Sequence, residues 1–185
     1  MQETTIAPIL EMIRNPALKD KGFLLLMDLF KEPIYWHIRR LVVSHHDAED
    51  ILQETFINVY RYVDTFKNES KISTWLYRIA TNECIKHFRK NNKRKLSGEI
   101  TEKITEGLSG SDSDNSEAIL LKFQAAILQL PEKQRIVFNL RYYDELSYEV
   151  IGQVLHSSAD TVKTNYHYAS QKVKQYLIDH AESKI

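Results

Sequence analysis

Hydrophobic residues recur every three or four positions along most of the chain, which is the spacing of amphipathic α-helices. The first long pattern covers residues 23–43, and Pro33 is expected to interrupt it. A second helix is predicted to open at Asp47 and to run through DAEDILQETFINVYRYV, with acidic and amide side chains opposite its apolar face. The first part of the chain is therefore predicted to be helical.

A polar loop with one aromatic residue, at positions 65–73, precedes the most informative helix, over residues 74–95. Ser73 is expected to cap the start of this helix with its hydroxyl group. One stripe along the helix is apolar and consists of Leu76, Ile79, Ala80, Cys84 and Phe88. A separate stripe carries basic and amide side chains, at Arg78, Asn82, Lys86, Arg89 and Lys93. The helix is therefore predicted to have one buried face and one cationic face.

The last third of the chain is predicted to contain four helices. The first starts at Ser116 and has one apolar face, formed by Ile119, Leu120, Phe123, Ile127 and Leu130. Pro131 ends it and begins the second helix. Helices over 147–155 and 159–177 follow, joined by a three-residue turn, with Ser158 as the expected N-cap of the last one.

Two short helices joined by such a turn are typical of a helix-turn-helix, although any helical hairpin of a bundle has the same outline. The polar residues at the start of the second helix favour the helix-turn-helix, because short hydrogen-bonding side chains suit a DNA groove better than a protein core. These residues are Asp160, Thr161, Lys163, Thr164, Asn165 and His167.

Composition supports an all-α chain, since 185 residues include only five glycines and four prolines. Cys84, the one cysteine, has no partner for an internal disulfide, and we expect a small core residue in a reducing compartment. No apolar run reaches the roughly 18 residues of a membrane span, and the first residues lack the pattern of a signal peptide. We therefore expect a soluble, cytoplasmic protein that does not insert into a membrane.

Charge is distributed unevenly, although 25 basic and 25 acidic residues balance over the whole chain. Residues 1–96 hold 16 basic and 12 acidic side chains, whereas residues 97–117 hold six acids against Lys103 alone. The second of these segments is rich in serine and glycine and is predicted to be a flexible acidic linker. The predicted organisation is two small helical domains, at 23–96 and 117–185, joined by a linker at 97–116. Residues 1–22 form an N-terminal extension to which we assign no function.

Two surfaces of the first domain suggest chemistry. The first is formed by the acidic and amide side chains of Asp50, Gln53 and Glu54. It is either a solvated surface near a helix start or a docking face for a basic partner, and the sequence leaves both readings open. The basic helix holds six Lys and Arg residues from Lys86 to Lys95 and no acid. Cations for phosphates, an amide for base edges and an aromatic side chain at Trp75 for stacking together suit partly melted DNA.

These segments resemble the sigma-70 family of RNA polymerase sigma factors, in particular its small extracytoplasmic-function (ECF) group. The stretch DAEDILQETF resembles region 2.2, and FKNESKISTWLYRIATNECIKHFRK resembles regions 2.3 and 2.4. The stretch LPEKQRIVFNLRYYDELSYEVIGQVL followed by TVKTNYHYA resembles region 4. The resemblance covers about 23–95 and 117–178, in the order and spacing of the family. It implies a protein that recognises and opens promoters, with catalysis left to the polymerase.

The resemblance also implies roles for single residues. Asp50, Gln53 and Glu54 would dock on the coiled coil of the polymerase β′ subunit, and residues 130–143 would meet the β flap. The loop at 66–73 would take a base flipped from the non-template strand. Residues implied at the −10 element are Phe66, Asn68, Lys71, Ser73, Trp75, Arg78, Asn82, Lys86 and Arg89. Residues implied at the −35 element are Ser158, Thr161, Lys163, Thr164 and His167.

The partners that the resemblance implies are core RNA polymerase, promoter DNA and an anti-sigma factor, often membrane-bound in this group; no cofactor is implied. The acidic linker would pass through a positively charged channel that nascent RNA later uses. Its carboxylates would then stand in for phosphates, and a plain soluble spacer is the alternative reading.

Two departures from the family pattern carry expectations of their own. His156 occupies the turn where the family usually has glycine, which predicts a residue other than glycine at positive φ. Arginines are frequent in the family at the positions of Asn165, Tyr168 and Ser170. Each cation that is missing at a phosphate lowers the slope of log affinity against log salt by about one unit. The second domain alone is therefore expected to bind −35 DNA poorly.

Other classes of protein fit less well. An enzyme is disfavoured because the chain has no glycine-rich phosphate loop, nucleophile arrangement or carboxylate pair in an apolar setting. His45, His46 and Asp47 are potential metal ligands, but a solvated surface at a helix start is the preferred interpretation, and we expect no metal. A helix-turn-helix regulator that binds duplex DNA without polymerase, and an adaptor or decoy that binds polymerase without opening promoters, are the remaining rivals.

Overall fold

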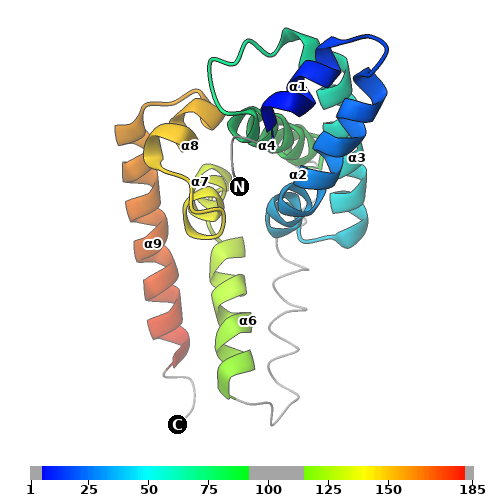
Figure 1. Ribbon diagram of the computed structural model, residues 1–185. Helices are drawn as coiled ribbons and strands as arrows, with labels where there is room; N and C mark the ends of the chain where they lie inside the picture. The colour runs from blue at the N-terminus through cyan, green and yellow to red at the C-terminus, as the bar shows by residue number, and fades with distance from the viewer. Residues whose placement is uncertain (1–5, 92–114, 182–185) are drawn as a thin grey trace. The chain divides into compact units, whose positions relative to one another are not determined.

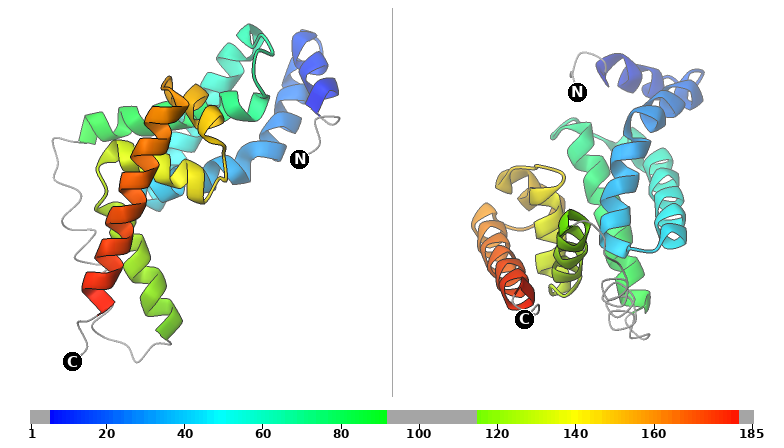
Figure 2. Two further views of the ribbon diagram at one scale, coloured as in Figure 1. Left: turned by 90° about the vertical axis from the view of Figure 1, so that its left-hand side faces the viewer. Right: turned by 90° about the horizontal axis from the view of Figure 1, so that it is seen from below.

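The computed structural model describes residues 6–91 and 115–181, and all secondary structure in these ranges is helical (Figures 1 and 2). The chain divides into two compact units, which are described separately. The N-terminal unit contains α1 (Ile6–Arg14), α2 (Lys19–Val42), α3 (His45–Tyr62), a short 3-10 helix η2 (Val63–Thr65) and α4 (Ile72–Asn91) as far as His87. The C-terminal unit contains α6 (Asn115–Leu128), α7 (Glu132–Tyr142), α8 (Tyr148–Leu155) and α9 (Ala159–Ala181). The all-α prediction is confirmed.

Helix α2 continues through Pro33, so the expected interruption is wrong. The proline ring removes one backbone hydrogen bond. The apolar stripe on both sides of it is nevertheless fully buried, at Phe30, Ile34 and Ile38. Burial of these side chains contributes about 1.5–3 kcal/mol each, which outweighs the loss of one hydrogen bond.

Helix α1, which lies in the N-terminal extension at 1–22, packs against α2. Ile9 and Ile13 are buried, and the approach of the two helices is very close at Gly22. A Cβ atom at Gly22 would lie 2.9 Å from Cγ1 of Ile13, so only glycine fits there without a shift. Helix α1 is therefore an integral part of the N-terminal unit.

The starts of α3 and α4 differ from the prediction. Helix α3 begins at His45 and not at Asp47, because the hydroxyl of Ser44 accepts a hydrogen bond from the backbone N–H of Asp47, at 3.2 Å. Helix α4 begins at Ile72, which places Ser73 inside the first turn and not at the N-cap. Phe66 and Ile72 are buried on either side of the connecting loop.

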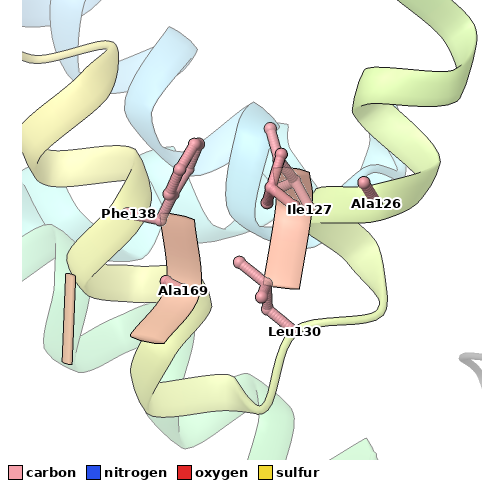
Figure 3. Close-up of a cluster of buried hydrophobic side chains, with 6 residues drawn as sticks. Ala126, Ile127, Leu130, Phe138 and Ala169 are labelled. Carbon is pink, nitrogen blue, oxygen red and sulfur yellow. The ribbon is translucent and has the colours of Figure 1, made fainter. Parts of the chain in front are cut away.

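The C-terminal unit has a core between α6, α7 and α9. Its buried members include Ala126, Ile127 and Leu130 from α6 and the segment after it, Phe138 from α7 and Ala169 from α9 (Figure 3). The predicted apolar face of α6 is only half correct, because Ile119 and Leu120 are 56% and 60% exposed. The core contacts only the C-terminal end of α6, and the N-terminal end of this helix extends beyond those contacts.

None of the helices in the two described ranges has the length and hydrophobicity that crossing a membrane requires.

Candidate nucleic-acid interface

Helix α3 presents an acidic surface opposite its buried face. Its buried residues include Ile51, Thr55 and Val59, while the predicted docking residues Asp50, Gln53 and Glu54 are all exposed. The structure thus brings the three residues together on one helix face. His46 lies near this face, with its Nε2 3.8 Å from a carboxylate oxygen of Asp50. The acidic face is available to a macromolecular partner.

An apolar groove adjoins the acidic face, and the sequence pattern did not indicate it. Its volume is about 530 Å³, and its lining includes Phe23, Met27 and Phe56 together with Gln53. Phe23 contacts Phe56 edge to face, at 6.4 Å between ring centroids. An acidic face beside an apolar groove suits an amphipathic helix with basic side chains. The helical period shows which side chains share a face of one helix, but not that α2 and α3 leave a groove between them.

Helix α4 presents the predicted polar stripe. Asn82, Lys86 and Arg89 are exposed, and Arg78 is half-buried. Lys86 Nζ lies 2.7 Å from Oε1 of Glu83, the one acid on this helix. The opposite stripe is fully buried at Leu76, Ala80 and Cys84, so the expected core role of Cys84 is confirmed. Lys93 lies outside the described residues.

A buried polar contact fixes how α4 is rotated about its axis. Nε2 of His37 on α2 lies 3.0 Å from Oγ1 of Thr81, and both side chains are fully buried. Buried polar groups require such partners, so turning α4 about its axis would break this hydrogen bond. Thr81 precedes Asn82, and the contact therefore directs the polar stripe outward.

The loop before α4 differs from the prediction at its aromatic residues. Phe66 and Trp75 are buried, with ring centroids 5.5 Å apart, and neither offers an open face for stacking a base. Asn68 and Lys71 are exposed, and Asn68 has φ 58°, a left-handed conformation that asparagine tolerates well. The aromatic pair thus holds the loop, and the polar residues are the ones presented to a ligand.

A cavity of about 550 Å³ lies beside this loop. It brings together Phe66, Asn68, Lys71 and Ser73, four of the residues expected at the −10 element. The other walls come from α1 and α2. In Figure 1, α1 lies at the same end of the N-terminal unit as the connection between α3 and α4. The contribution of α1 was missed, because nothing in residues 1–22 signals that they fold against a loop some 50 positions away.

Helices α8 and α9 form the predicted helix-turn-helix. His156 has φ 50° and ψ 48°, so the prediction of a non-glycine residue at positive φ is confirmed. Only glycine fits at position 152 without a shift, since a Cβ atom there would lie 2.6 Å from the carbonyl oxygen of Ser157. Ser158 caps α9 as expected, accepting a hydrogen bond from the backbone N–H of Thr161, at 3.2 Å.

The exposed polar groups of α9 largely bond to their own helix. Thr164 Oγ1 donates to the carbonyl of Asp160 at 2.9 Å, and Asn165 donates to the carbonyl of Thr161 at 2.9 Å. Thr161, Lys163, Thr164 and His167 are exposed along this face, as predicted. The result is a rigid polar surface on which Lys163 is the one residue with a fixed positive charge.

The segment between α7 and α8 is held by charged side chains. Arg141 donates to the carbonyl of Leu146 at 3.0 Å and lies over the ring of Tyr148, 5.1 Å from its centroid. At the start of α8, the backbone N–H of Glu149 and the hydroxyl of Ser147 donate hydrogen bonds that hold the pKa of the Glu149 carboxyl below its usual value. These contacts fix the first helix of the motif.

Two polar pairs join the start of α2 to the end of α3 and to η2. Lys19 pairs with Asp64, and this hydrogen bond raises the pKa of the ammonium group. Tyr60 donates to Asp20 at 2.7 Å, which raises the pKa of the phenol. Among the described residues, no three His, Cys, Asp or Glu side chains lie close enough together to hold a metal ion.

Comparison with known proteins gives two family models that match in chain order. The model Sigma-70 region 2 matches residues 26–94, and the model Sigma-70, region 4 matches residues 120–173. The ECF RNA polymerase sigma factor SigW of Bacillus subtilis is 38% identical over 164 residues, which is 83% of this chain and 88% of SigW. The ECF RNA polymerase sigma-E factor of Escherichia coli is 30% identical over 163 residues, covering 83% and 85%.

Solved structures share the fold. The sigma factor RpoE of Bartonella quintana, in complex with the anti-sigma factor NepR, matches with a TM-score of 0.66 at 21% identity, covering 85% of this chain and 97% of RpoE. CnrH, in complex with the cytosolic domain of CnrY, matches with a TM-score of 0.68 at 17% identity, covering 92% and 96%.

Proposed function

The chain belongs to the ECF group of the sigma-70 family, and from this premise we propose which of its surfaces perform each step of promoter recognition. It is a promoter-recognising sigma factor for transcription initiation, and not an enzyme. The observation that carries the proposal is the opposite charge of two faces of one small domain. Helix α3 exposes carboxylates, while α4 exposes cations and an amide.

The acidic face of α3 is proposed to bind the coiled coil of the polymerase β′ subunit through Asp50, Gln53 and Glu54. The apolar groove lined by Phe23 and Phe56 supports this assignment, because it gives a partner helix an apolar seat beside the charged contacts. Charge complementarity would then select the partner and speed its association.

The polar stripe of α4 is proposed to face the −10 element. Arg78, Lys86 and Arg89 would neutralise phosphates, and Asn82 would read a base edge. The loop residues Asn68, Lys71 and Ser73 would contact a base flipped from the non-template strand. The buried Phe66 and Trp75 would support that loop through their contact with each other, in place of the stacking role expected of Trp75.

The C-terminal unit is proposed to read the −35 element with the first turns of α9. Ser158, Thr161, Lys163, Thr164 and His167 would lie in the major groove. Residues 130–143 would meet the β flap, supported by the half-exposed Tyr142 and an apolar groove of about 460 Å³ beside it. The linker at 97–116 would join the −10 domain at 23–96 to this domain at 117–185.

Control by an anti-sigma factor is proposed on the same membership, supported by RpoE of Bartonella quintana, which is solved in complex with the anti-sigma factor NepR. A sigma factor acts on DNA inside the cell, and we place this one in the cytoplasm. An anti-sigma factor would compete with polymerase for the exposed faces described above.

Replacing Asn82 by alanine tests the −10 assignment directly. A base contact contributes about 1–3 kcal/mol of discrimination, so the preference of the holoenzyme at one −10 position should fall at least fivefold. The measurement is transcription from a promoter library with all four bases at each −10 position. Gln124→Ala, at an exposed amide of α6, is the matched control and should keep the full preference. An unaltered preference of Asn82→Ala at every position would refute the role of Asn82.

A further inference from the structure

The cavity beside the loop before α4 has one wall that no sequence signal suggested. Ile6, Ala7, Leu10, Glu11 and Arg14 from α1 line it. The family model for region 2 begins at residue 26, so this wall lies outside the matched segment. It is nevertheless built into the unit, because Ile9 and Ile13 are buried against α2.

Polar side chains from α1, the loop and the first turn of α4 converge on this cavity. Within the described residues, the side chains of Glu11, Arg14, Asn68, Ser70 and Ser73 form no hydrogen bond or ion pair with one another or with other groups. Glu11 and Arg14 are exposed, one turn apart on α1. An acceptor and a donor are therefore presented side by side toward the space that the loop encloses.

The rest of the lining suits a planar ligand. The half-buried Tyr77 and Pro33 supply ring surface, and the buried Phe30 and Phe66 complete an apolar lining. The volume of about 550 Å³ falls within the ~300–1,000 Å³ of typical small-molecule pockets. A nucleobase is a flat ring system with hydrogen-bonding edges, and a base extruded from the stack is recognised through those edges.

We propose that α1 forms the second wall of the −10 base pocket and that Glu11 and Arg14 select the base held there. This inference rests on the proposed function. A carboxylate accepts hydrogen bonds from an amino group, and a guanidinium donates to a carbonyl or ring nitrogen. Each of the four bases presents an N–H donor beside an acceptor on its hydrogen-bonding edge, so Glu11 and Arg14 favour the one base whose donor and acceptor lie within their reach.

The test uses the holoenzyme assembled from the full chain and core polymerase. Its affinity is measured by fluorescence anisotropy for forked promoter DNA, whose single-stranded −10 segment carries each of the four bases at each position in turn. The wild-type protein should prefer one base over the other three at one position by about tenfold or more. The double variant Glu11→Gln with Arg14→Gln should reduce that preference to about twofold and leave the other positions unchanged.

The matched control is Asp28→Asn with Lys21→Gln, which removes one acid and one base from exposed sites on α2 outside the cavity. It should keep the wild-type preference. Circular dichroism should show unchanged helicity for both double variants, since all four side chains are exposed.

Three results would overturn the inference. If the Glu11/Arg14 variant keeps every preference, α1 does not select the base, and the proposed function stands. If the wild-type holoenzyme shows no preference at any −10 position, the proposed function fails together with the inference. The last result concerns nucleoside 5′-monophosphates, which are titrated against the full chain. If they bind the wild-type chain and not the Glu11/Arg14 variant, while this variant keeps its promoter preference, the cavity is a site for a free nucleotide.

Discussion

Helices α4 and α9 both bury one stripe and present a polar one, yet the two polar stripes differ in charge. On α4 the stripe carries Arg78, Lys86 and Arg89 around a single amide, Asn82. On α9 the start of the helix carries hydroxyls, an amide and a histidine, with Lys163 as the one fixed cation. Because ionic contacts to phosphate supply most of the non-specific affinity for DNA, we assign that affinity to the first unit. The second unit must rely on shape and on the placement of its hydrogen bonds.

The two units also differ in what keeps their surfaces in place. The proposed −10 face depends on packing between distant segments, including the His37–Thr81 contact between α2 and α4. The proposed −35 face depends on a short local motif, with Gly152 at the close approach, His156 at the turn and Ser158 at the cap. A substitution in this local motif should therefore disable the C-terminal unit and leave the N-terminal unit unchanged.

The largest effect is expected from reversing the acidic face, which acts on polymerase binding before either DNA surface is used. Asp50→Lys with Glu54→Lys should weaken binding of core polymerase about a hundredfold, because like charges would meet the basic partner. The affinity is measured by competition with the wild-type chain. Asp28→Lys with Glu32→Lys makes the same change of charge on exposed sites of α2 and should bind normally. Equal affinity of the two double variants would remove the docking assignment.

A smaller effect, confined to the second unit, is expected from Gly152→Ala. The added methyl group would meet the carbonyl of Ser157 at 2.6 Å, and such overpacking costs about 1–3 kcal/mol. Hydrogen exchange should therefore speed up about 5- to 150-fold in α8 and the start of α9 and stay unchanged in α2–α4. Gln153→Ala, at the exposed neighbouring position, should leave all rates as they are. Faster exchange in both units would show that they are not independent.

The smallest effect concerns salt, and it sharpens the contrast between α4 and α9. Arg78→Gln, Lys86→Gln and Arg89→Gln together should lower the slope of log affinity against log salt by about two units on DNA with a single-stranded −10 segment. Lys163→Gln should lower the slope on a −35 duplex by less than one unit. Both slopes are obtained from titrations of the holoenzyme at several salt concentrations. Equal changes in the two slopes would contradict the division of labour between the units.

Local features of the helix-turn-helix could be predicted from the sequence because they depend on neighbours in the chain. His156 at positive φ and Ser158 at the N-cap are both of this kind. The stripes of α4 were also predictable, since the helical period alone sorts Cys84 inward and Asn82 outward.

Features that depend on packing between elements could not be predicted. Periodicity shows that Ile119 and Leu120 share a face, but not that the core stops short of them. An aromatic residue beside a polar loop could equally be exposed or buried, and Phe66 and Trp75 bury each other. The wall that α1 gives to the loop depends on Gly22, whose close approach to Ile13 has no signature in the sequence.

The most direct test of the central claim is permanganate reactivity of thymines in a promoter library. The chain alone, core polymerase alone and the mixture of both are compared. A promoter-opening sigma factor predicts reactive thymines only in the mixture, clustered at the −10 element. A specific footprint from the chain alone without opening in the mixture, or polymerase binding with neither opening nor footprint, would contradict this account.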